Sequence, residues 1–295
     1  MNLVISDKIR LGVSSCLLGM QVRWNGAHSR ESYLEQIISK YVSWTSICPE
    51  VEIGMGVPRE PIRLVGKSDS EIRLVGTKSE NDYTDLMQTW AQKQAKELIN
   101  VGLDGYIFKK DSPSCGISRV KVYRDQSLPI RDGIGLYARN IIDVLPSLPV
   151  EDEGRLKNPK IREHFFQRVF AYHRWQVFRY SNPKLKDLIN FHGEHKLTLM
   201  AHNPKGQKEL GRFVAQMGTN NEDAFDSYGI QFMKALESRA TPGRHVNVLT
   251  HLMGFIKKSL SQDDRNEFLH LLNQYKHGLI PLIVPHTMIK HYLRK

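Results

Sequence analysis

The 295-residue sequence contains only three cysteines, Cys16, Cys48 and Cys115, and no apolar run approaching roughly 18 residues. An odd number of cysteines cannot close into a complete set of intrachain disulfides, so we expect a reducing, cytoplasmic compartment. The lack of a long apolar run argues against a membrane partner. Charges at Asp7 and Lys8 interrupt the stretch where a secretory signal peptide would need its apolar segment.

Two phosphate-binding signatures are also missing from the sequence. Neither GxGxxG nor GxxxxGK[ST] occurs, so nothing indicates a nucleotide cofactor. Hydrophobic residues make up 40% and charged residues 25% of the chain, which is typical of a globular protein and argues against disorder. At roughly 150 residues per domain, this length predicts about two domains.

Positive charge is distributed unevenly along the chain, whose net charge is +11. Residues 1–150 contain 19 Lys or Arg and 17 Asp or Glu, whereas residues 151–295 contain 23 and 14, a net charge of +9. The second half also contains 11 of the 12 histidines, while the first half contains all the cysteines. This division predicts chemistry in the first half and contact with a polyanion in the second.

The first half alternates strand-like and helix-like segments. Strands are predicted at 9–15, 43–47 and 105–109, and helices at 30–41 and 81–100. This order predicts an α/β domain with a parallel, Rossmann-like sheet. The pentapeptide IRLVG occurs at both 62–66 and 72–76, around a polar turn, which predicts a β-hairpin insertion.

A proline-rich and acidic stretch at 146–160 predicts a linker between domains 1–148 and 160–295. The second half shows helical periodicity and no convincing strand alternation, so we expect an all-α C-terminal domain. Its helices are predicted at 161–180, 183–201, 205–217, 221–236, 244–260, 263–277 and 281–293.

Each cysteine comes shortly after a predicted strand. Because the carboxyl ends of parallel strands share one edge of a sheet, Cys16, Cys48 and Cys115 are expected to converge there. Reduced cysteines buried in a core are one interpretation. A structural zinc site would need a fourth ligand, and His28 is the only histidine in this half. A [4Fe-4S] cluster on three thiolates would leave one iron open as a Lewis acid.

Three motifs, in this order, resemble the thiouracil desulfidase family and span about residues 10–145. They are Ser15-Cys-Leu-Leu-Gly19 continuing to Val22-Arg-Trp-Asn-Gly26, Cys48-Pro-Glu50 followed by Gly54-Met-Gly-Val-Pro-Arg-Glu-Pro-Ile-Arg-Leu64, and Lys110-Asp-Ser-Pro-Ser-Cys-Gly116. The basic helical half resembles the partner domain of two-domain members, which are similar to bacterial tRNA 4-thiouridine desulfidases. Where the family often carries Tyr-Asp-Gly, this sequence has Trp24-Asn25-Gly26, which weakens any acid role for position 25.

The resemblance implies a [4Fe-4S] cluster held by the three cysteines, whose open iron binds a thiocarbonyl sulfur while water attacks the ring carbon without net electron transfer. Glu50 would activate that water and Ser112 would orient it or carry a proton, with Ser114 less favoured. From the residues alone, the alternatives are a surface acid and a turn-forming serine. Further substrate contacts are expected at Arg23, Asn25 and Lys110.

The basic half supplies the candidate RNA contacts. Arginines alternate with aromatic residues over 161–180, a combination used for base stacking and phosphate contact, although an aromatic stripe at helical spacing is also typical of a core. The expected RNA-binding residues are Arg162, Arg168, Arg174, Lys205, Lys208 and Arg244. His192 and His195 are three residues apart, but no third ligand nearby indicates a metal site.

Four functions are compatible with these patterns, and the cysteine motifs together with the charge division favour the first. The first is [4Fe-4S]-dependent desulfuration of 4-thiouridine in tRNA to uridine. The second is desulfuration of free thiouracil or thionucleosides, with the helical half serving dimerisation or regulation. The third is an iron-sulfur or thiol-based sensor that binds nucleic acid without turnover, and the fourth is a structural RNA-binding protein that holds no iron.

Overall fold

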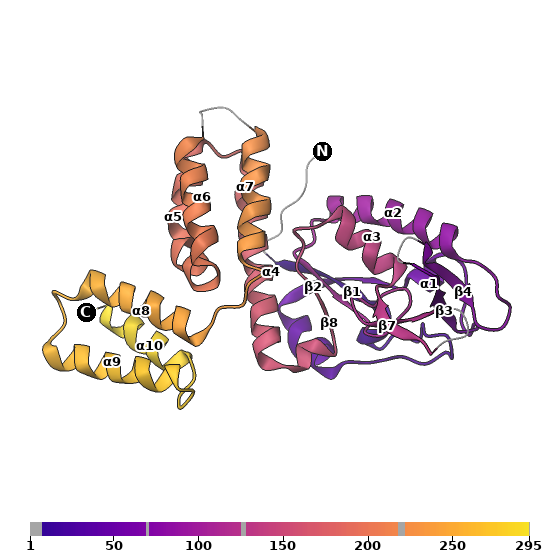
Figure 1. Ribbon diagram of the computed structural model, residues 1–295, viewed down its shortest axis with the longest axis horizontal. Helices are drawn as coiled ribbons and strands as arrows, with labels where there is room; N and C mark the ends of the chain where they lie inside the picture. The colour runs from indigo at the N-terminus through magenta and orange to yellow at the C-terminus, as the bar shows by residue number, and fades with distance from the viewer. Residues whose placement is uncertain (1–7, 69–70, 125–127, 218–221, 295) are drawn as a thin grey trace. The chain divides into compact units, whose positions relative to one another are not determined.

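The computed structural model describes residues 8–68, 71–124, 128–217 and 222–294, and its chain forms two compact units, Met1–Val177 and Phe178–Lys295 (Figure 1). The first unit is α/β and the second is helical, as expected from the sequence. Within the described ranges, no helix combines the length and apolar character needed to cross a bilayer.

Four strands form a parallel sheet in the first unit. They are β1 (Ile9–Ser14), β2 (Val42–Ile47), β5 (Gly105–Phe108) and β8 (Val150–Asp152), in the order β2-β1-β5-β8. All three neighbouring pairs are parallel. The carboxyl ends of β2, β1 and β5 therefore lie side by side at one edge of the sheet.

The central strand β1 is apolar because both faces of the sheet are covered. Leu11 and Val13 are fully buried. Gly12 lies against the ring of Tyr106, and a Cβ at this position would come within 2.2 Å of a ring carbon. Only glycine permits this close approach between β1 and the β5 side chain.

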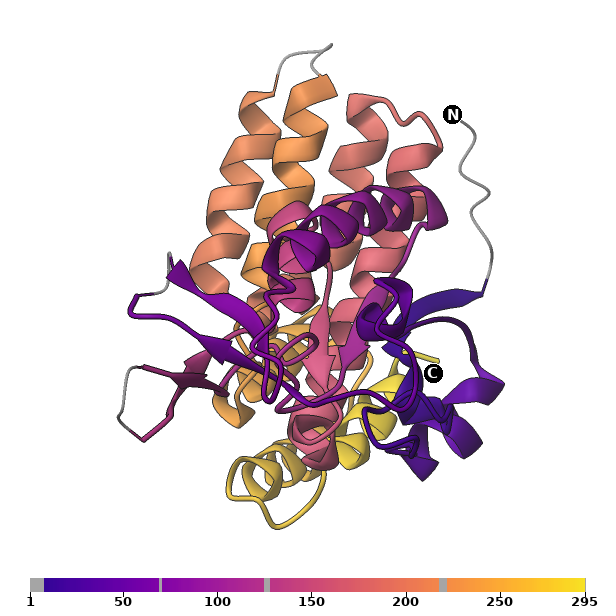
Figure 2. The ribbon, with the colours of Figure 1, turned by 90° about the vertical axis from the view of Figure 1, so that its right-hand side faces the viewer.

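A second sheet has the order β4-β3-β6-β7 and contains β3 (Ile62–Val65), β4 (Arg73–Gly76), β6 (Val120–Tyr123) and β7 (Ile130–Gly133). The repeated pentapeptides form the expected antiparallel pair β3–β4. The hairpin β6–β7 was not predicted, because three of the four residues of β7 are exposed and lack apolar alternation. Figure 2 shows the two hairpins extending toward its left side.

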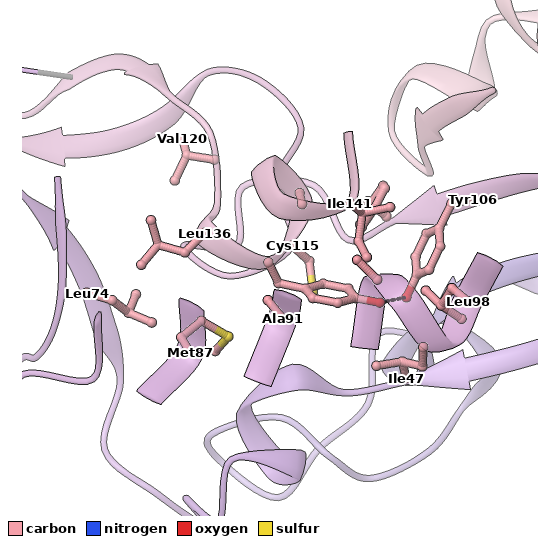
Figure 3. Close-up of a cluster of buried hydrophobic side chains, with 14 of the residues drawn as sticks. Ile47, Leu74, Met87, Ala91, Leu98, Tyr106, Cys115, Val120, Leu136 and Ile141 are labelled. Atoms are coloured by element: carbon pink, nitrogen blue, oxygen red, sulfur yellow. Dashed lines mark hydrogen bonds between the residues drawn. The ribbon is translucent and has the colours of Figure 1, made fainter. Parts of the chain in front are cut away.

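Helices α2 (Thr84–Val101) and α3 (Leu136–Val144) pack together over the main core of this unit. Figure 3 shows Met87, Ala91 and Leu98 of α2 close to Leu136 and Ile141 of α3. Cys115 lies in the same cluster, where the Tyr137 hydroxyl donates a hydrogen bond to the Tyr106 hydroxyl oxygen at 3.2 Å. Cys115 is therefore anchored directly against this core, and Cys16 belongs to a second core cluster.

The helix predicted at 30–41 is wrong as a continuous α-helix. The segment forms a π-helical turn, η2 (Tyr33–Ile37), followed by a 3-10 turn, η3 (Ile38–Lys40). The Ser39 hydroxyl donates to the Leu34 carbonyl at 3.0 Å and accepts from the Trp44 indole at 2.8 Å. The Ser39 hydroxyl competes with backbone N–H groups for the Leu34 carbonyl, and the two neighbouring β-branched isoleucines have a low helix propensity. Both effects favour irregular turns over a continuous α-helix.

The linker expected at 146–160 is also part of the first unit. It contains β8 and the 3-10 turn η5 (Arg155–Lys157). The prolines do not prevent β8 from forming, because proline is tolerated at the start of an edge strand. The long helix α4 (Pro159–Tyr180) then places Phe165 and Val169 in a core cluster of this unit. The structure therefore divides the chain after Val177, rather than between 148 and 160.

The second unit shows only helices in its described residues, and each helix overlaps one predicted from the sequence. They are α5 (Leu185–His202), α6 (Pro204–Gln216), α7 (Glu222–Ala235), α8 (Pro242–Ile256), α9 (Gln262–Lys276) and α10 (Ile283–Tyr292). Local caps explain where several begin: the Thr241 hydroxyl accepts the Arg244 amide, and Ser261 forms a capping box with Asp264.

Candidate functional site

The three cysteines follow three adjacent parallel strands. Cys16 lies after β1 in the turn η1 (Ser15–Leu18), and Cys48 follows β2 at the start of the short helix α1 (Pro49–Glu52). Cys115 belongs to the loop that leaves β5. All three line one cavity of about 410 Å³ at the carboxyl edge of the sheet. The structure thus brings together residues separated by up to 99 positions in the sequence.

Burial favours the protonated thiol over the thiolate at all three cysteines. None of the three cysteines forms a disulfide. Burial raises the pKa of Cys16 to about 11, raises the pKa of Cys48, and places that of Cys115 well above its ordinary value. Lys109 and Arg23 oppose the shift at Cys16, but burial is the larger effect. A cationic group entering the cavity would favour their deprotonation.

The donor set fits a soft metal group larger than one ion. Thiolates are preferred by iron-sulfur clusters as well as by zinc. Across the described ranges, no three His, Cys, Asp or Glu side chains are close enough together to share a single metal ion. The three sulfurs nevertheless line one cavity and are near enough for the charges of Cys16 and Cys48 to affect the pKa of Cys115.

Glu50 lies in this cavity with both carboxylate oxygens hydrogen-bonded. The Arg59 Nε donates to Oε2 at 3.0 Å, and the Ser114 hydroxyl donates to Oε1 at 2.9 Å. The Arg59 side chain is only 4% exposed and also donates to the carbonyls of Val22 and Gly56 at 2.9 and 2.8 Å. These contacts fix the position of Glu50 between the loops that carry the cysteines.

The two serines of the β5 loop have different environments. Ser112 lines the cavity, and its hydroxyl oxygen accepts the backbone N–H groups of Ser114 and Cys115 at 3.2 and 3.1 Å. Ser114 is fully buried and donates to Glu50. Ser112 therefore faces the cavity and holds the turn that presents Cys115, whereas Ser114 contacts the carboxylate.

The remaining predicted contacts divide between cavity and surface. Arg23 and Lys110 line the cavity. Asn25 is not among its lining residues: its Oδ1 accepts the Ala27 amide at 3.2 Å in an exposed turn. Trp24 and Lys109 also line the cavity, although neither is given a role from the sequence.

Arg59 is the most informative residue that sequence reasoning missed. It lies within the Gly54–Leu64 motif, which indicated that the segment matters but gave no role to any of its charges. Its pairing with Glu50 depends on the fold of the loop between α1 and β3, which no local periodicity reveals. The available signal in the sequence was an arginine that had no proposed role and lay close along the chain to the candidate base Glu50.

Structural contacts account for some of the candidate RNA-binding residues. The Arg162 guanidinium lies 4.5 Å from the centre of the Tyr33 ring, and Arg244 donates to the His202 carbonyl. Lys205 and Lys208 are exposed on α6, and Arg174 is exposed on α4. Arg168 is partly buried. Among the aromatics of α4, Phe165 and Trp175 are buried, so the stripe contributes mainly to cores.

The histidine pair on α5 takes part in packing. His192 Nδ1 lies 3.1 Å from the Tyr228 hydroxyl, and the buried His195 places Nδ1 2.8 Å from the Phe191 carbonyl. The His195 ring also stacks on Phe191. His195 is buried in the helical unit, and the partly buried His192 packs beside Tyr228.

The part of the chain that forms the cavity matches a known protein family. A family model described as 2-thiouracil desulfurase matches residues 11–153. The chain belongs to the 2-thiouracil desulfurase family. In this desulfurase-family protein, the matched region runs from β1 to just beyond β8 and contains all three cysteines, Glu50 and Ser112. A second model, for a protein family of unknown function (DUF1722), matches residues 196–295.

Three related proteins were also found. The chain is 30% identical over 128 residues to the uncharacterized protein YbgA of Escherichia coli K12, covering 43% of this chain and 76% of that protein. It is 31% identical over 108 residues to the uncharacterized protein YbbK of Bacillus subtilis 168, covering 35% and 71%. The solved [4Fe-4S]-dependent thiouracil desulfidase TudS is 26% identical, with a TM-score of 0.40, covering 51% of this chain and 94% of that one.

Proposed function

We propose that this desulfurase-family protein removes sulfur from 4-thiouridine in tRNA, giving uridine, with a [4Fe-4S] cluster held by Cys16, Cys48 and Cys115. The observation that carries this proposal is the single cavity lined by three thiols and a fixed carboxylate. Its volume of about 410 Å³ lies within the range of small-molecule binding sites. Family membership supports sulfur removal as the reaction class.

When bound, such a cluster would supply one iron without a protein ligand, able to bind the substrate sulfur and polarise the thiocarbonyl bond. The overall reaction replaces sulfur by oxygen: a thiocarbonyl and water give a carbonyl and hydrogen sulfide. No electrons are gained or lost, so the protein needs no redox partner for this step.

Glu50 is the residue placed to take a proton from the attacking water. Each carboxylate oxygen has two lone-pair directions, so Oε1 can accept a water proton while keeping its hydrogen bond from Ser114. Arg59 holds the other oxygen and limits the motion of the carboxylate. A general base in a defined position contributes about 10²- to 10⁴-fold to the rate.

Ser112 is placed to hydrogen-bond the substrate or the water. Its oxygen already accepts two backbone N–H groups, so the hydroxyl proton is available for donation into the cavity. Arg23 and Lys110 line the same cavity and supply positive charge around the ring. These groups orient the substrate while Glu50 handles the proton.

The choice of tRNA as the substrate is supported by the charge of the second half. Residues 151–295 have a net charge of +9, and Lys205 and Lys208 are exposed on α6. An excess of positive charge attracts the phosphate backbone of nucleic acid, with strong dependence on salt.

Mass spectrometry of nucleosides tests this function. Anaerobically reconstituted full-length protein is incubated with tRNA that contains 4-thiouridine, and the tRNA is then digested. We expect 4-thiouridine to be replaced by uridine, and Cys48→Ala to abolish the conversion. Unchanged 4-thiouridine with protein that carries about four irons and four sulfides per chain would contradict the proposal.

A second candidate is desulfuration of free thiouracil, favoured by the description of the matching family model. The same protein is assayed with free 2-thiouracil, 4-thiouracil and 4-thiouridine. Conversion of the free bases together with intact 4-thiouridine in tRNA would favour this second function over the first.

A further inference from the structure

Trp24 is the one aromatic side chain among the described residues that line the cavity of the cysteines. The residue is 44% exposed. Tryptophan contributes to a fold mainly through the large apolar area that it buries, and Trp24 leaves much of that area in contact with water. None of the roles described above uses this residue.

The other three tryptophans of the chain have structural contacts. The Trp44 indole donates a hydrogen bond at 2.8 Å, and Trp175 is buried. The centre of the Trp90 ring lies 5.4 Å from that of Tyr137. Within the described ranges, Trp24 forms no side-chain hydrogen bond and no ring contact. Its indole is therefore available to a ligand in the cavity.

The backbone of Trp24, in contrast, is held in a tight turn. The Gly26 amide donates to the Arg23 carbonyl at 2.9 Å, and the Arg23 amide donates to the Ala27 carbonyl at 3.1 Å. The Arg59 amide donates to the Trp24 carbonyl at 2.8 Å. Because the main chain is already fixed, a ligand that binds the indole has to order only one side chain.

Arg59 connects this turn to the proposed base. Its backbone amide holds the Trp24 carbonyl, while its Nε donates to Glu50 Oε2 at 3.0 Å. The same residue thus fixes the main chain of Trp24 and the carboxylate of Glu50. A ring held by the indole is thereby positioned by the residue that also positions the base.

We propose that Trp24 stacks on the planar ring of the substrate and makes the cavity specific for thiocarbonyl groups that belong to a conjugated ring. The inference rests on the proposed function and deepens it, since stacking applies equally to a free base and to a nucleotide in RNA. Every nucleobase has a π face on which an aromatic side chain can stack, and loss of such a side chain weakens binding about 5- to 100-fold.

Binding without turnover provides the first test. Full-length protein, with and without a reconstituted cluster, is titrated anaerobically with uracil and with uridine. Trp24→Leu keeps an apolar side chain but removes the ring, whereas Trp24→Tyr keeps a ring. We expect both ligands to bind at least about fivefold more weakly to Trp24→Leu, and within about twofold of the parent to Trp24→Tyr.

Proton NMR distinguishes stacking from a general apolar contact. The H5 and H6 resonances of uracil should move upfield on binding to the cluster-free parent, because these protons would lie over the face of the indole ring. Trp24→Tyr should keep an upfield shift and Trp24→Leu should lose it. An unchanged shift with Trp24→Leu would overturn the proposal.

The matched control is Tyr41→Leu, which removes an aromatic ring that is 70% exposed and lies outside the cavity lining. It should bind uracil as the parent does. Trp24→Leu should have the urea midpoint and the iron content of the parent, because no contact of its indole is lost in the described part of the chain. A lower midpoint together with unchanged uracil affinity would assign Trp24 to the fold and overturn the proposal.

Kinetics with the reconstituted enzyme provide the second test. Trp24→Leu should raise KM for 4-thiouracil and for 4-thiouridine at least about fivefold, with smaller changes in kcat, and Trp24→Tyr should restore KM to within about twofold of the parent. Equal KM values for Trp24→Leu and the parent would overturn the proposal. Equal losses for Trp24→Leu and Trp24→Tyr would do the same.

The two tests separate failure of this inference from failure of the proposed function. If the parent converts thio compounds and Trp24→Leu has the same KM, stacking is refuted and desulfuration stands. If the parent converts none of them while uracil binding depends on a ring at position 24, desulfuration is refuted and stacking stands. Absence of uracil binding to either form of the parent refutes stacking.

Discussion

The Ser114 hydroxyl donates a hydrogen bond to Glu50 at 2.9 Å and thereby joins the loop after β5 to the helix after β2. Ser114 immediately precedes Cys115, and Glu50 lies two residues beyond Cys48. Arg59 completes the arrangement from a third segment. The orientation of the carboxylate is therefore tied to the same loops that position two of the thiols.

Glu50→Gln should lower kcat by about 10²- to 10⁴-fold, because the amide keeps the shape of the side chain but cannot accept a proton. Iron content should stay at the parent value, since Glu50 is not a proposed ligand. Desulfuration kinetics and iron analysis on the same preparation check both statements. Activity within about threefold of the parent would remove Glu50 as the base.

Ser114→Ala should lower kcat about tenfold with little change in KM, because Glu50 loses one of the donors that hold it. Ser114 is a positioning residue, so the decisive measurement is whether the substitution lowers kcat while KM stays nearly unchanged. Ser112→Ala, in contrast, should change both constants, since its hydroxyl faces the cavity. A drop in kcat for Ser114→Ala that follows iron loss in proportion would contradict the positioning role.

The convergence of the cysteines was predictable because it depends only on strand order and on each cysteine following a strand. Parallel strands β2, β1 and β5 present their carboxyl ends together, whatever the loops do. The contacts of Glu50 were not predictable in the same way. Arg59 and Ser114 are separated from Glu50 by 9 and 64 positions in the sequence and lie in irregular loops. A loop has no periodic pattern from which side-chain contacts could be predicted.

Each of Cys16→Ala, Cys48→Ala and Cys115→Ala should lower the iron and sulfide content of reconstituted protein to below about one third of the parent, because a cluster on two thiolates is poorly held. Iron and sulfide assays and the visible absorption spectrum check this outcome. Ser46→Ala is the matched control, an exposed position on β2 two residues from Cys48. Full iron content in all three cysteine variants would refute the ligand assignment.

The contacts divide the chain after Val177, later than the proline-rich stretch from which the sequence predicts a linker. Pro146 and Pro149 lie just before β8. This edge strand has three residues, too few to show an alternating apolar pattern in the sequence. Helix α4 was predicted correctly, but its role in two clusters was not, since helical periodicity does not indicate what covers the apolar face.

A chain that ends at residue 159 should therefore be far less stable than one that ends at residue 181. The shorter chain lacks Phe165 and Val169, whose burial stabilises the first unit by roughly 3–6 kcal/mol together. It also loses the contact of 3.0 Å between His173 and the buried Asp104. Urea denaturation and proteolysis compare the two chains. Equal midpoints would show that α4 does not belong to the first unit.

Stability of the helical unit should fall as pH is lowered from about 7.5 to about 5.5. Burial lowers the pKa of His192 and of His245, so each is less readily protonated in the folded chain than in the unfolded chain. Below the ordinary histidine value of 6.5, the unfolded state binds more protons, and the free energy of unfolding decreases as pH falls. The slope from each histidine is limited to about 1.4 kcal/mol per pH unit.

His245→Gln should reduce this pH dependence, because glutamine does not titrate and can still hydrogen-bond the Tyr275 hydroxyl, which lies 2.6 Å from His245 Nδ1. Thermal unfolding of the full-length protein at several pH values measures the slope, and a lower midpoint at neutral pH would not affect the comparison. His286→Gln, at an exposed position on α10, should leave the slope at the parent value. If His245→Gln has the same slope as the parent, the acid sensitivity arises elsewhere.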